Sequence, residues 1–123
     1  MAEKVDRTKA CPFLLRCFLR PNSHNRPDSF QREESLPRDE LQIYTWTDAT
    51  LREVTSLVQG VHDLPRRRNA RLEFSFVYPD KMGKMVMREV GSVHSSRKGP
   101  SDDATLKELR FQTGDYIDIA VCT

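Results

Sequence analysis

The segment Glu40–Val61, ELQIYTWTDATLREVTSLVQGV, changes its hydrophobic period at Trp46, the only tryptophan of the chain. Before Trp46 the apolar residues alternate, which is typical of a strand with one buried face. From Leu51 onward they recur at helical spacing. A strand joined so directly to an amphipathic helix predicts an α+β domain, in which the helix covers one face of a sheet.

The predicted helix carries an apolar stripe of five residues: Leu51, Val54, Leu57, Val58 and Val61. Thr47 or Asp48 is expected to cap its first turn, because a short side-chain oxygen can accept an unpaired backbone N–H. In the strand before it, residues 41–46, alternation directs Leu41 and Ile43 toward the helix. Tyr44 and Trp46 then lie on the opposite, uncovered face.

Four more alternating segments predict strands: residues 12–20, 72–79, 85–93 and 116–121. Residues 104–109 have room for one short helical turn. The order strand, strand, helix, strand, strand, turn, strand is that of the ubiquitin-like β-grasp fold. In that fold the first and last strands lie parallel at the centre of a mixed sheet, and the one main helix packs on one face.

The chain is long enough for one domain with a modest core. Residues 1–10 are polar and are expected to be flexible, and residues 11–123 are expected to form a single ubiquitin-like domain. Residues 21–39 hold three prolines and mixed charge, and predict a long inserted loop between strands 1 and 2. The only aromatic residue of this loop, Phe30, either docks it onto the fold or meets a partner.

The uncovered sheet face is a candidate protein-binding patch, because exposed apolar patches often mark contacts. Tyr44 and Trp46 form its centre. Neighbouring strands would add Leu14, Phe18, Val77 and either Tyr116 or Ile117. Two alternatives need no partner: Trp46 turns inward and packs under the helix start, or the 21–39 insertion covers the patch.

Four arginines form the densest positive cluster: Arg66, Arg67, Arg68 and Arg71. The functional interpretation is contact with RNA phosphates or an acidic protein segment. The simpler interpretation, which we favour, is a solvated helix end where cations complement the helix dipole. The formal net charge of +2 does not by itself favour binding to nucleic acid or a membrane.

No catalytic, phosphate-binding or metal-binding motif is present, so we expect no enzymatic activity and no cofactor. The three histidines lie in separate loops, without a second ligand at metal spacing: His24, His62 and His94. No nucleophile has an adjacent base and a third, orienting group. Asp118 is out of phase with Ile117 and Ile119, which places it on the outer face as a surface carboxylate.

The three cysteines are Cys11, Cys17 and Cys122. Their odd number argues against a disulfide framework and fits a reducing compartment. Cys17 and Cys122 lie in apolar strand patterns and are interpreted as small core residues. No apolar run approaches the ~18 residues of a membrane helix, and the first residues lack the apolar stretch of a signal peptide, so an intracellular protein is expected.

Six segments together carry a family resemblance: DRTKACPFLLRCF, DELQIYTWTDATLREVTSLV, RRRNARLEFSFVYP, MREVGS, RKGPSDDATL and FQTGDYIDIAV. They resemble the eighteen-kilodalton Sin-associated polypeptide family, especially its plant-type members, from about Asp6 to the end. The resemblance implies a ubiquitin-like, non-catalytic adaptor that is monomeric until it is bound in a complex. It implies a nuclear location, with the cytoplasm as a further possibility.

The implied partners belong to two assemblies. One is a histone deacetylase corepressor complex built on a Sin-type scaffold, and the other is an exon-junction-associated splicing complex with acinus and a serine-rich-domain RNA-binding protein. RNA is then contacted only through partners. Direct RNA binding by Arg66–Arg71 is the alternative; a ubiquitin-like modifier is disfavoured, because the sequence ends in Ala-Val-Cys-Thr rather than Gly-Gly. Surface reasoning selects the candidate partner-binding residues: Tyr44, Trp46, Phe30, Phe18, Arg66, Arg67 and Arg68.

Overall fold

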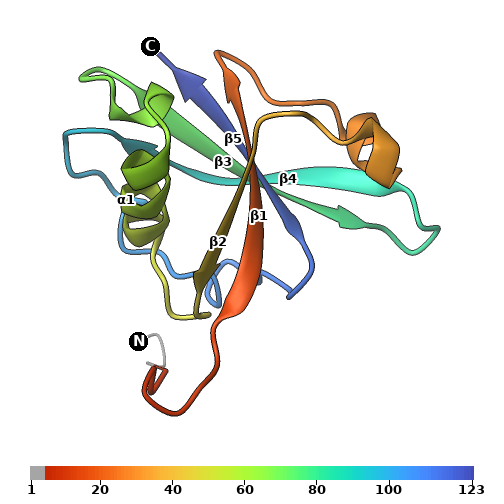
Figure 1. Cartoon of the computed structure of the whole chain (residues 1–123), viewed down its shortest axis with the longest axis horizontal. Helices are drawn as coiled ribbons and strands as arrows, with labels where there is room; N and C mark the ends of the chain where they lie inside the picture. Colours follow the sequence, from red (N-terminus) through yellow and green to blue (C-terminus); the bar gives the residue numbers. More distant parts are fainter. Residues whose placement is uncertain (1–4) are drawn as a thin grey trace.

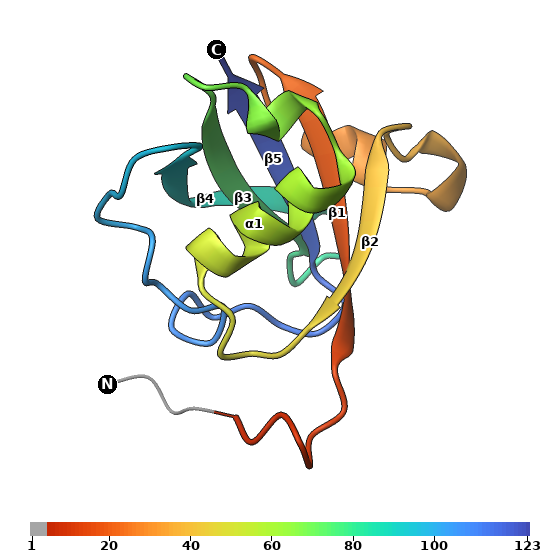
Figure 2. The same cartoon turned by 60° about the vertical axis from the view of Figure 1, so that its left-hand side comes forward.

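The computed structural model describes residues 5–123; residues 1–4, the start of the segment predicted to be flexible, lie outside the described residues. One α-helix crosses one face of a five-stranded mixed sheet (Figures 1 and 2). The elements are β1 (Phe13–Pro21), β2 (Glu40–Thr45), α1 (Leu51–Val61), β3 (Arg71–Pro79), β4 (Met85–His94) and β5 (Tyr116–Cys122). The strand order is β2-β1-β5-β3-β4, with β1 parallel to β5 and the other neighbours antiparallel. The predicted α+β, ubiquitin-like grasp is therefore confirmed.

Short helical pieces complete the chain. Two 3₁₀ turns lie in the 21–39 insertion, η1 (Pro27–Phe30) and η2 (Glu33–Ser35), and a third, η3 (Leu64–Arg66), follows α1. The predicted turn at residues 104–109 is present, since the Leu109 N–H donates to the Thr105 carbonyl at 3.0 Å. Thr105 and Glu108 bond each other's backbone N–H reciprocally, which is a capping box.

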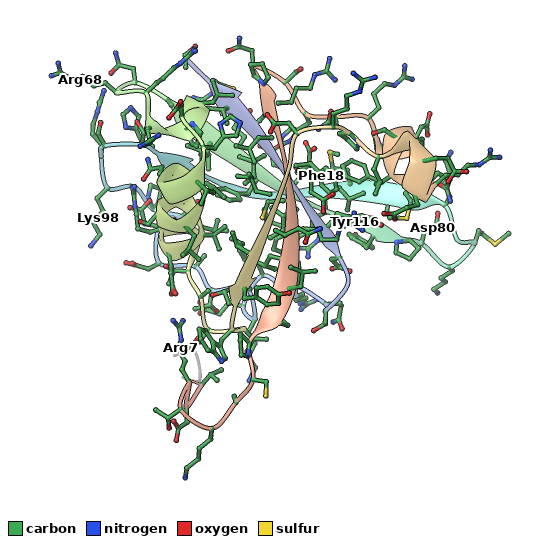
Figure 3. All side chains as sticks on the ribbon, viewed as in Figure 1. Arg7, Phe18, Arg68, Asp80, Lys98 and Tyr116 are labelled. Atoms are coloured by element: carbon green, nitrogen blue, oxygen red, sulfur yellow. The ribbon has the colours of Figure 1, made fainter. Side chains whose placement is uncertain are left out.

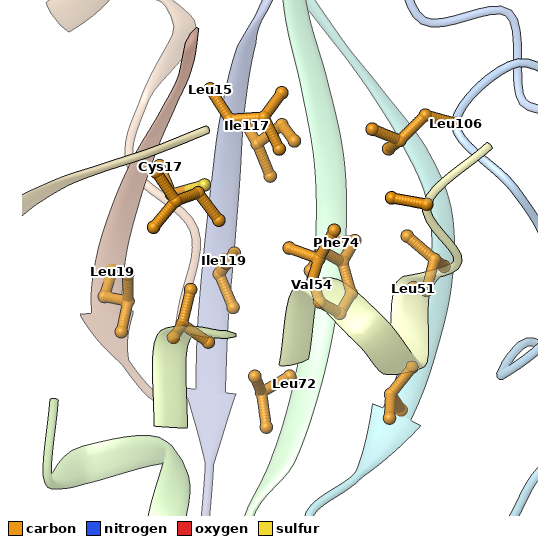
Figure 4. Close-up of a cluster of buried hydrophobic side chains, with 14 of the residues drawn as sticks. Leu15, Cys17, Leu19, Leu51, Val54, Leu72, Phe74, Leu106, Ile117 and Ile119 are labelled. Atoms are coloured by element: carbon orange, nitrogen blue, oxygen red, sulfur yellow. The ribbon is translucent and has the colours of Figure 1, made fainter. Parts of the chain in front are cut away.

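The core lies between α1 and the inner sheet face (Figure 4). Alternation placed the inner residues of β1 correctly: Leu15, Cys17 and Leu19 are all buried. The buried residues of α1 are Leu51, Val54, Thr55 and Val58. The predicted stripe was wrong at its margin, because Leu57 is 37% exposed and Val61 is 64% exposed. The buried side of α1 is the narrow arc that residues 51, 54, 55 and 58 occupy.

The helix cap also differs from the prediction. Thr50, not Thr47 or Asp48, caps α1, and its side chain accepts the Glu53 N–H at 3.1 Å. The reason is a turn between β2 and α1, closed by the Ala49 N–H on the Trp46 carbonyl at 3.0 Å. This turn delays the helix, and Asp48 binds the N-terminal segment instead.

Candidate protein-binding surfaces

The outer sheet face is largely covered by the 21–39 insertion. Phe30 stands edge-on to Phe18, with ring centroids 5.1 Å apart, and lies 5.3 Å from the ring of Tyr116. Val77 is buried in the same cluster, and Figure 3 shows Phe18 and Tyr116 at the centre of the sheet. The prediction that Phe18 and Val77 are exposed is therefore wrong. The alternative, that the insertion covers the patch, is confirmed for this part of the outer face. Ile117 faces the helix-side core, so Tyr116 is the outer residue.

Asp118 fastens the insertion to the sheet. Its Oδ2 accepts the Asn25 N–H at 3.1 Å and lies 2.7 Å from His24 Nδ1, while its Oδ1 accepts from the Asn25 side chain at 2.7 Å. Asp118 is on the outer face as predicted, but it is fully buried and not a surface carboxylate. Its hydrogen bond raises the pKa of His24 above the ordinary value.

Ser75 completes a Ser-His-Asp series that sequence reasoning missed. Ser75 is the register neighbour of Asp118, and its Oγ lies 3.5 Å from His24 Nε2. Such a series activates serine only where a substrate carbonyl can reach the hydroxyl. Ser75 is 1% exposed beneath the insertion, so the three residues serve as a buried polar anchor. A polar residue in the middle of both β3 and β5 was the available sequence signal.

Trp46 lies neither in the core nor free in solvent. Its indole N–H donates to the Ala10 carbonyl at 2.8 Å, and the Arg7 guanidinium stands over the ring, 4.8 Å from its centroid. Arg7 is itself paired with Asp48 and Glu53, each at 2.8 Å. The interpretation of Trp46 as a core residue is therefore wrong, and the N-terminal segment covers part of its ring.

Tyr44 is the exposed member of the predicted patch. Its side chain is 64% exposed on edge strand β2. Leu14 is its register partner on β1 and is half-buried. Tyr44 and Leu14 thus form an uncovered apolar area at the end of the sheet that the insertion does not reach.

The arginine cluster is partly neutralised by its neighbours. Arg66 pairs with Asp63, and Arg71 pairs with Glu73 at 3.1 Å. Arg67 and Arg68 are exposed and form no ion pair within residues 5–123. The Ser95 hydroxyl bonds the carbonyls of both at 2.7 and 2.9 Å, which brings a second basic loop beside the first. In Figure 3, Arg68 and Lys98 both project at the α1 side of the molecule.

Other chemistry in the described part of the chain is limited. Cys17 is buried, and burial raises the pKa of its thiol to about 12. Cys122, predicted to be a core residue, is only half-buried and lies 3.6 Å from Glu73. Within residues 5–123, no three His, Cys, Asp or Glu side chains gather in a group able to hold a metal ion. None of the described helices is long and apolar enough to cross a membrane.

Comparisons with known proteins place this chain in one family. The family model described as Sin3 associated polypeptide p18 (SAP18) matches residues 4–121. A protein of Arabidopsis thaliana named histone deacetylase complex subunit SAP18 is 50% identical over 121 residues, covering 97% of this chain and 80% of that protein. The human protein of the same name is 47% identical, covering 95% and 77%, and that of Drosophila melanogaster is 39% identical, covering 97% and 79%. The chain belongs to the Sin3 associated polypeptide p18 family.

Proposed function

We propose that this protein is a non-catalytic, protein-binding subunit of histone deacetylase corepressor complexes and acts in the nucleus. The observation that carries the proposal is the 50% identity to a histone deacetylase complex subunit across 97% of the chain. The family model matches residues 4–121, which hold the insertion and the sheet from β1 into β5. The proposed partners are a Sin-type scaffold and the deacetylase.

A second assembly is part of the same proposal. We infer that the chain also joins an acinus-like protein and a serine-rich-domain RNA-binding protein in a splicing-associated complex. The uncovered area around Tyr44 supports a protein-binding role, because solvent-exposed aromatic side chains are enriched at interfaces. RNA would then be contacted through the partner.

The direct test is reconstitution with purified partners. The full chain is titrated calorimetrically, and run on a sizing column, against a Sin-type scaffold with its deacetylase and separately against an acinus segment. Stable complexes in both experiments would support the whole proposal. A folded chain that binds only one partner restricts the function to that assembly, and a folded chain that binds neither contradicts the proposal.

Direct RNA binding through Arg66–Arg71 is the competing function. Two of its four arginines are already paired with carboxylates, which lowers the charge available to phosphates. The adjoining loop adds Arg97 and Lys98, but it also carries Asp102 and Asp103 beside them. This function requires the isolated chain to bind RNA with an affinity that falls steeply as salt rises, which a titration at two salt concentrations measures.

A further inference from the structure

Figure 1 shows the part of the β3–β4 hairpin that extends beyond α1. A cavity of about 550 Å³ opens beside this part of the hairpin. Its lining residues are Tyr78, Pro79, Arg88, Arg110, Gln112 and Asp115. None of them belongs to the surfaces described above. The volume is within the ~300–1,000 Å³ typical of ligand pockets.

The hairpin wall of this cavity is held in place from both faces. On the cavity side, the Arg88 guanidinium lies 5.5 Å from the centroid of the Phe76 ring and donates to the Leu109 carbonyl at 2.6 Å. On the opposite face, the Gln31 side chain donates to the Gly83 carbonyl at 2.9 Å and accepts the Met85 N–H at 3.0 Å. The insertion therefore supports a preformed pocket wall, which lowers the entropic cost of binding.

Arg110 stands on the other wall in an unusual backbone conformation. Its φ of 63° is left-handed, and its N–H closes the turn on the Lys107 carbonyl at 3.0 Å. Glycine or asparagine is usual where a helical turn ends in this way, because a Cβ is disfavoured there. An arginine with this backbone conformation in a pocket points to a role for its side chain.

The charges of the pocket select the ligand. The lining includes two arginines, Arg88 and Arg110, and one carboxylate, Asp115, and no salt bridge within residues 5–123 includes either arginine. Arginine binds a carboxylate through two parallel hydrogen bonds. Asp115 would repel a doubly charged phosphate more than a single carboxylate. Tyr78 and Pro79 supply an apolar wall beside the cations.

We propose that this pocket binds an acidic side chain, glutamate or aspartate, with a neighbouring apolar side chain, from an extended segment of a partner protein. The inference deepens the proposed protein-binding function, on which it rests. A polypeptide is favoured over a small metabolite because Pro79, Arg110 and Gln112 are all exposed at the rim. A metabolite would need most of its surface buried, whereas a partner segment makes further contacts outside the pocket.

The test is a nuclear magnetic resonance titration of the full ¹⁵N-labelled chain with the peptide acetyl-Leu-Glu-Leu-amide. Matched probes are acetyl-Leu-Gln-Leu-amide and inorganic phosphate. We expect the glutamate peptide to shift the backbone amides of Tyr78–Arg88 and Arg110–Asp115, with a dissociation constant of about millimolar order. No shifts there at about 10 mM peptide, equal binding of the glutamine peptide, or tighter binding of phosphate would each overturn the proposal.

Variants separate the pocket from the fold. Arg110→Gly removes the cation and relieves the backbone, so its melting temperature should equal or exceed that of the wild type while the peptide binds at least about tenfold more weakly. Arg88→Gln should also weaken binding. Asn22→Gly is the matched control, because Asn22 is the other non-glycine residue among residues 5–123 with a left-handed φ, 65°, and it lies outside the pocket. Loss of binding in Asn22→Gly, or retention in Arg110→Gly, contradicts the proposal.

The same variants distinguish this proposal from the proposed function. If the wild type and Arg110→Gly assemble equally well with the purified corepressor scaffold, the pocket has no role in assembly. The proposed subunit function is then unaffected. If the wild type does not assemble but binds the glutamate peptide in the pocket, the subunit function is contradicted. The preference of the pocket for an acidic side chain is then unaffected. We expect the wild type to assemble and Arg110→Gly to do so at least about tenfold more weakly.

Discussion

Trp46 shows how a large aromatic side chain can stabilise the fold without entering the core. Its ring is stabilised by the Arg7 guanidinium and its N–H by the Ala10 carbonyl. A cation–π contact contributes about 0.5–1 kcal/mol, and a hydrogen bond contributes about 1 kcal/mol. Both contacts tie the N-terminal segment to the point where β2 ends and the turn into α1 begins.

We predict that Trp46→Ala lowers the free energy of unfolding by about 1.5–2 kcal/mol, which is the sum of these two contacts. Phe74→Ala is the control for a true core aromatic, since Phe74 is fully buried, and should cost about 3–5 kcal/mol. Urea unfolding of both variants measures the difference. Equal losses of unfolding free energy in the two variants would indicate that Trp46 is a core residue.

The His24–Asp118 pair predicts a pH dependence. Because the folded state raises the pKa of His24 through its hydrogen bond to Asp118, the pair stabilises the fold fully below the unfolded pKa of about 6.5. This contribution is lost as the pH rises through the folded pKa. His24→Gln should therefore cost more stability at about pH 5.5 than at about pH 8.5.

Urea unfolding at the two pH values checks this prediction. Asn25→Ala is the control, because the Asn25 side chain donates to the same Asp118 carboxylate but carries no group that titrates between these pH values. Its cost should be similar at both pH values. A pH-independent cost for His24→Gln would show that its hydrogen bonds, and not its charge, hold the insertion.

The alternation of apolar residues in a strand predicts which face of the sheet each side chain points to. It does not predict which other segments cover that face. Alternation correctly put Leu15 inside and Asp118 outside. It could not show that Asp118 is buried, because the groups that cover it come from residues about 93 positions earlier in the chain. Long-range partners of this kind have no local signal in one sequence.

At the scale of elements, the start of α1 depends on one hydroxyl. The Thr50 side chain accepts the Glu53 N–H, so Thr50→Ala should lower the free energy of unfolding by about 1 kcal/mol. Thr47→Ala is the matched control, and we expect it to cost under about 0.5 kcal/mol. Thermal or urea unfolding compares the two. A larger loss in Thr47→Ala than in Thr50→Ala would indicate that Thr47 caps α1, as expected from the sequence.

The insertion is an integral layer of the fold and depends on Phe30. Phe30→Ala should cost about 3 kcal/mol, because it opens the cluster with Phe18 and Tyr116. It should also increase the fluorescence of a dye that binds exposed apolar surface. Phe30→Leu, which keeps an apolar side chain, should lose much less. Full stability of Phe30→Ala with loss of partner binding would instead make Phe30 an interface residue.

Elements were easier to predict than their docking. The predicted strand limits differ by about a residue from the observed ones because alternating patterns end at prolines, glycines and polar runs. The same signals predict the 21–39 insertion. Its place on the outer face was left open, since one aromatic residue in a polar loop is compatible with solvent, a partner or the sheet.

At the scale of the whole molecule, the apolar surface that remains is dispersed. The most exposed large apolar side chains of residues 5–123 are Tyr44 on β2, Val61 on α1 and Met82 at the hairpin tip. The insertion has removed the centre of the outer face from solvent. A partner that binds through apolar contacts therefore has few places to choose from: Tyr44 beside Leu14 on the outer sheet face, or Val61 and Leu57, one helical turn apart, on α1.

We predict that Tyr44→Ala keeps its free energy of unfolding within about 0.5 kcal/mol, because the side chain is 64% exposed. Its affinity for the purified corepressor scaffold should fall at least about tenfold, since tyrosines at the centre of an interface commonly act as hot spots. Val61→Ala is the control, with equal exposure on the helix face. Tyr44 and Val61 lie on opposite sides of the sheet, so one compact partner segment cannot bury both side chains. Calorimetric titration of both variants therefore decides between the two faces. A loss of affinity in Val61→Ala alone would place the scaffold on α1.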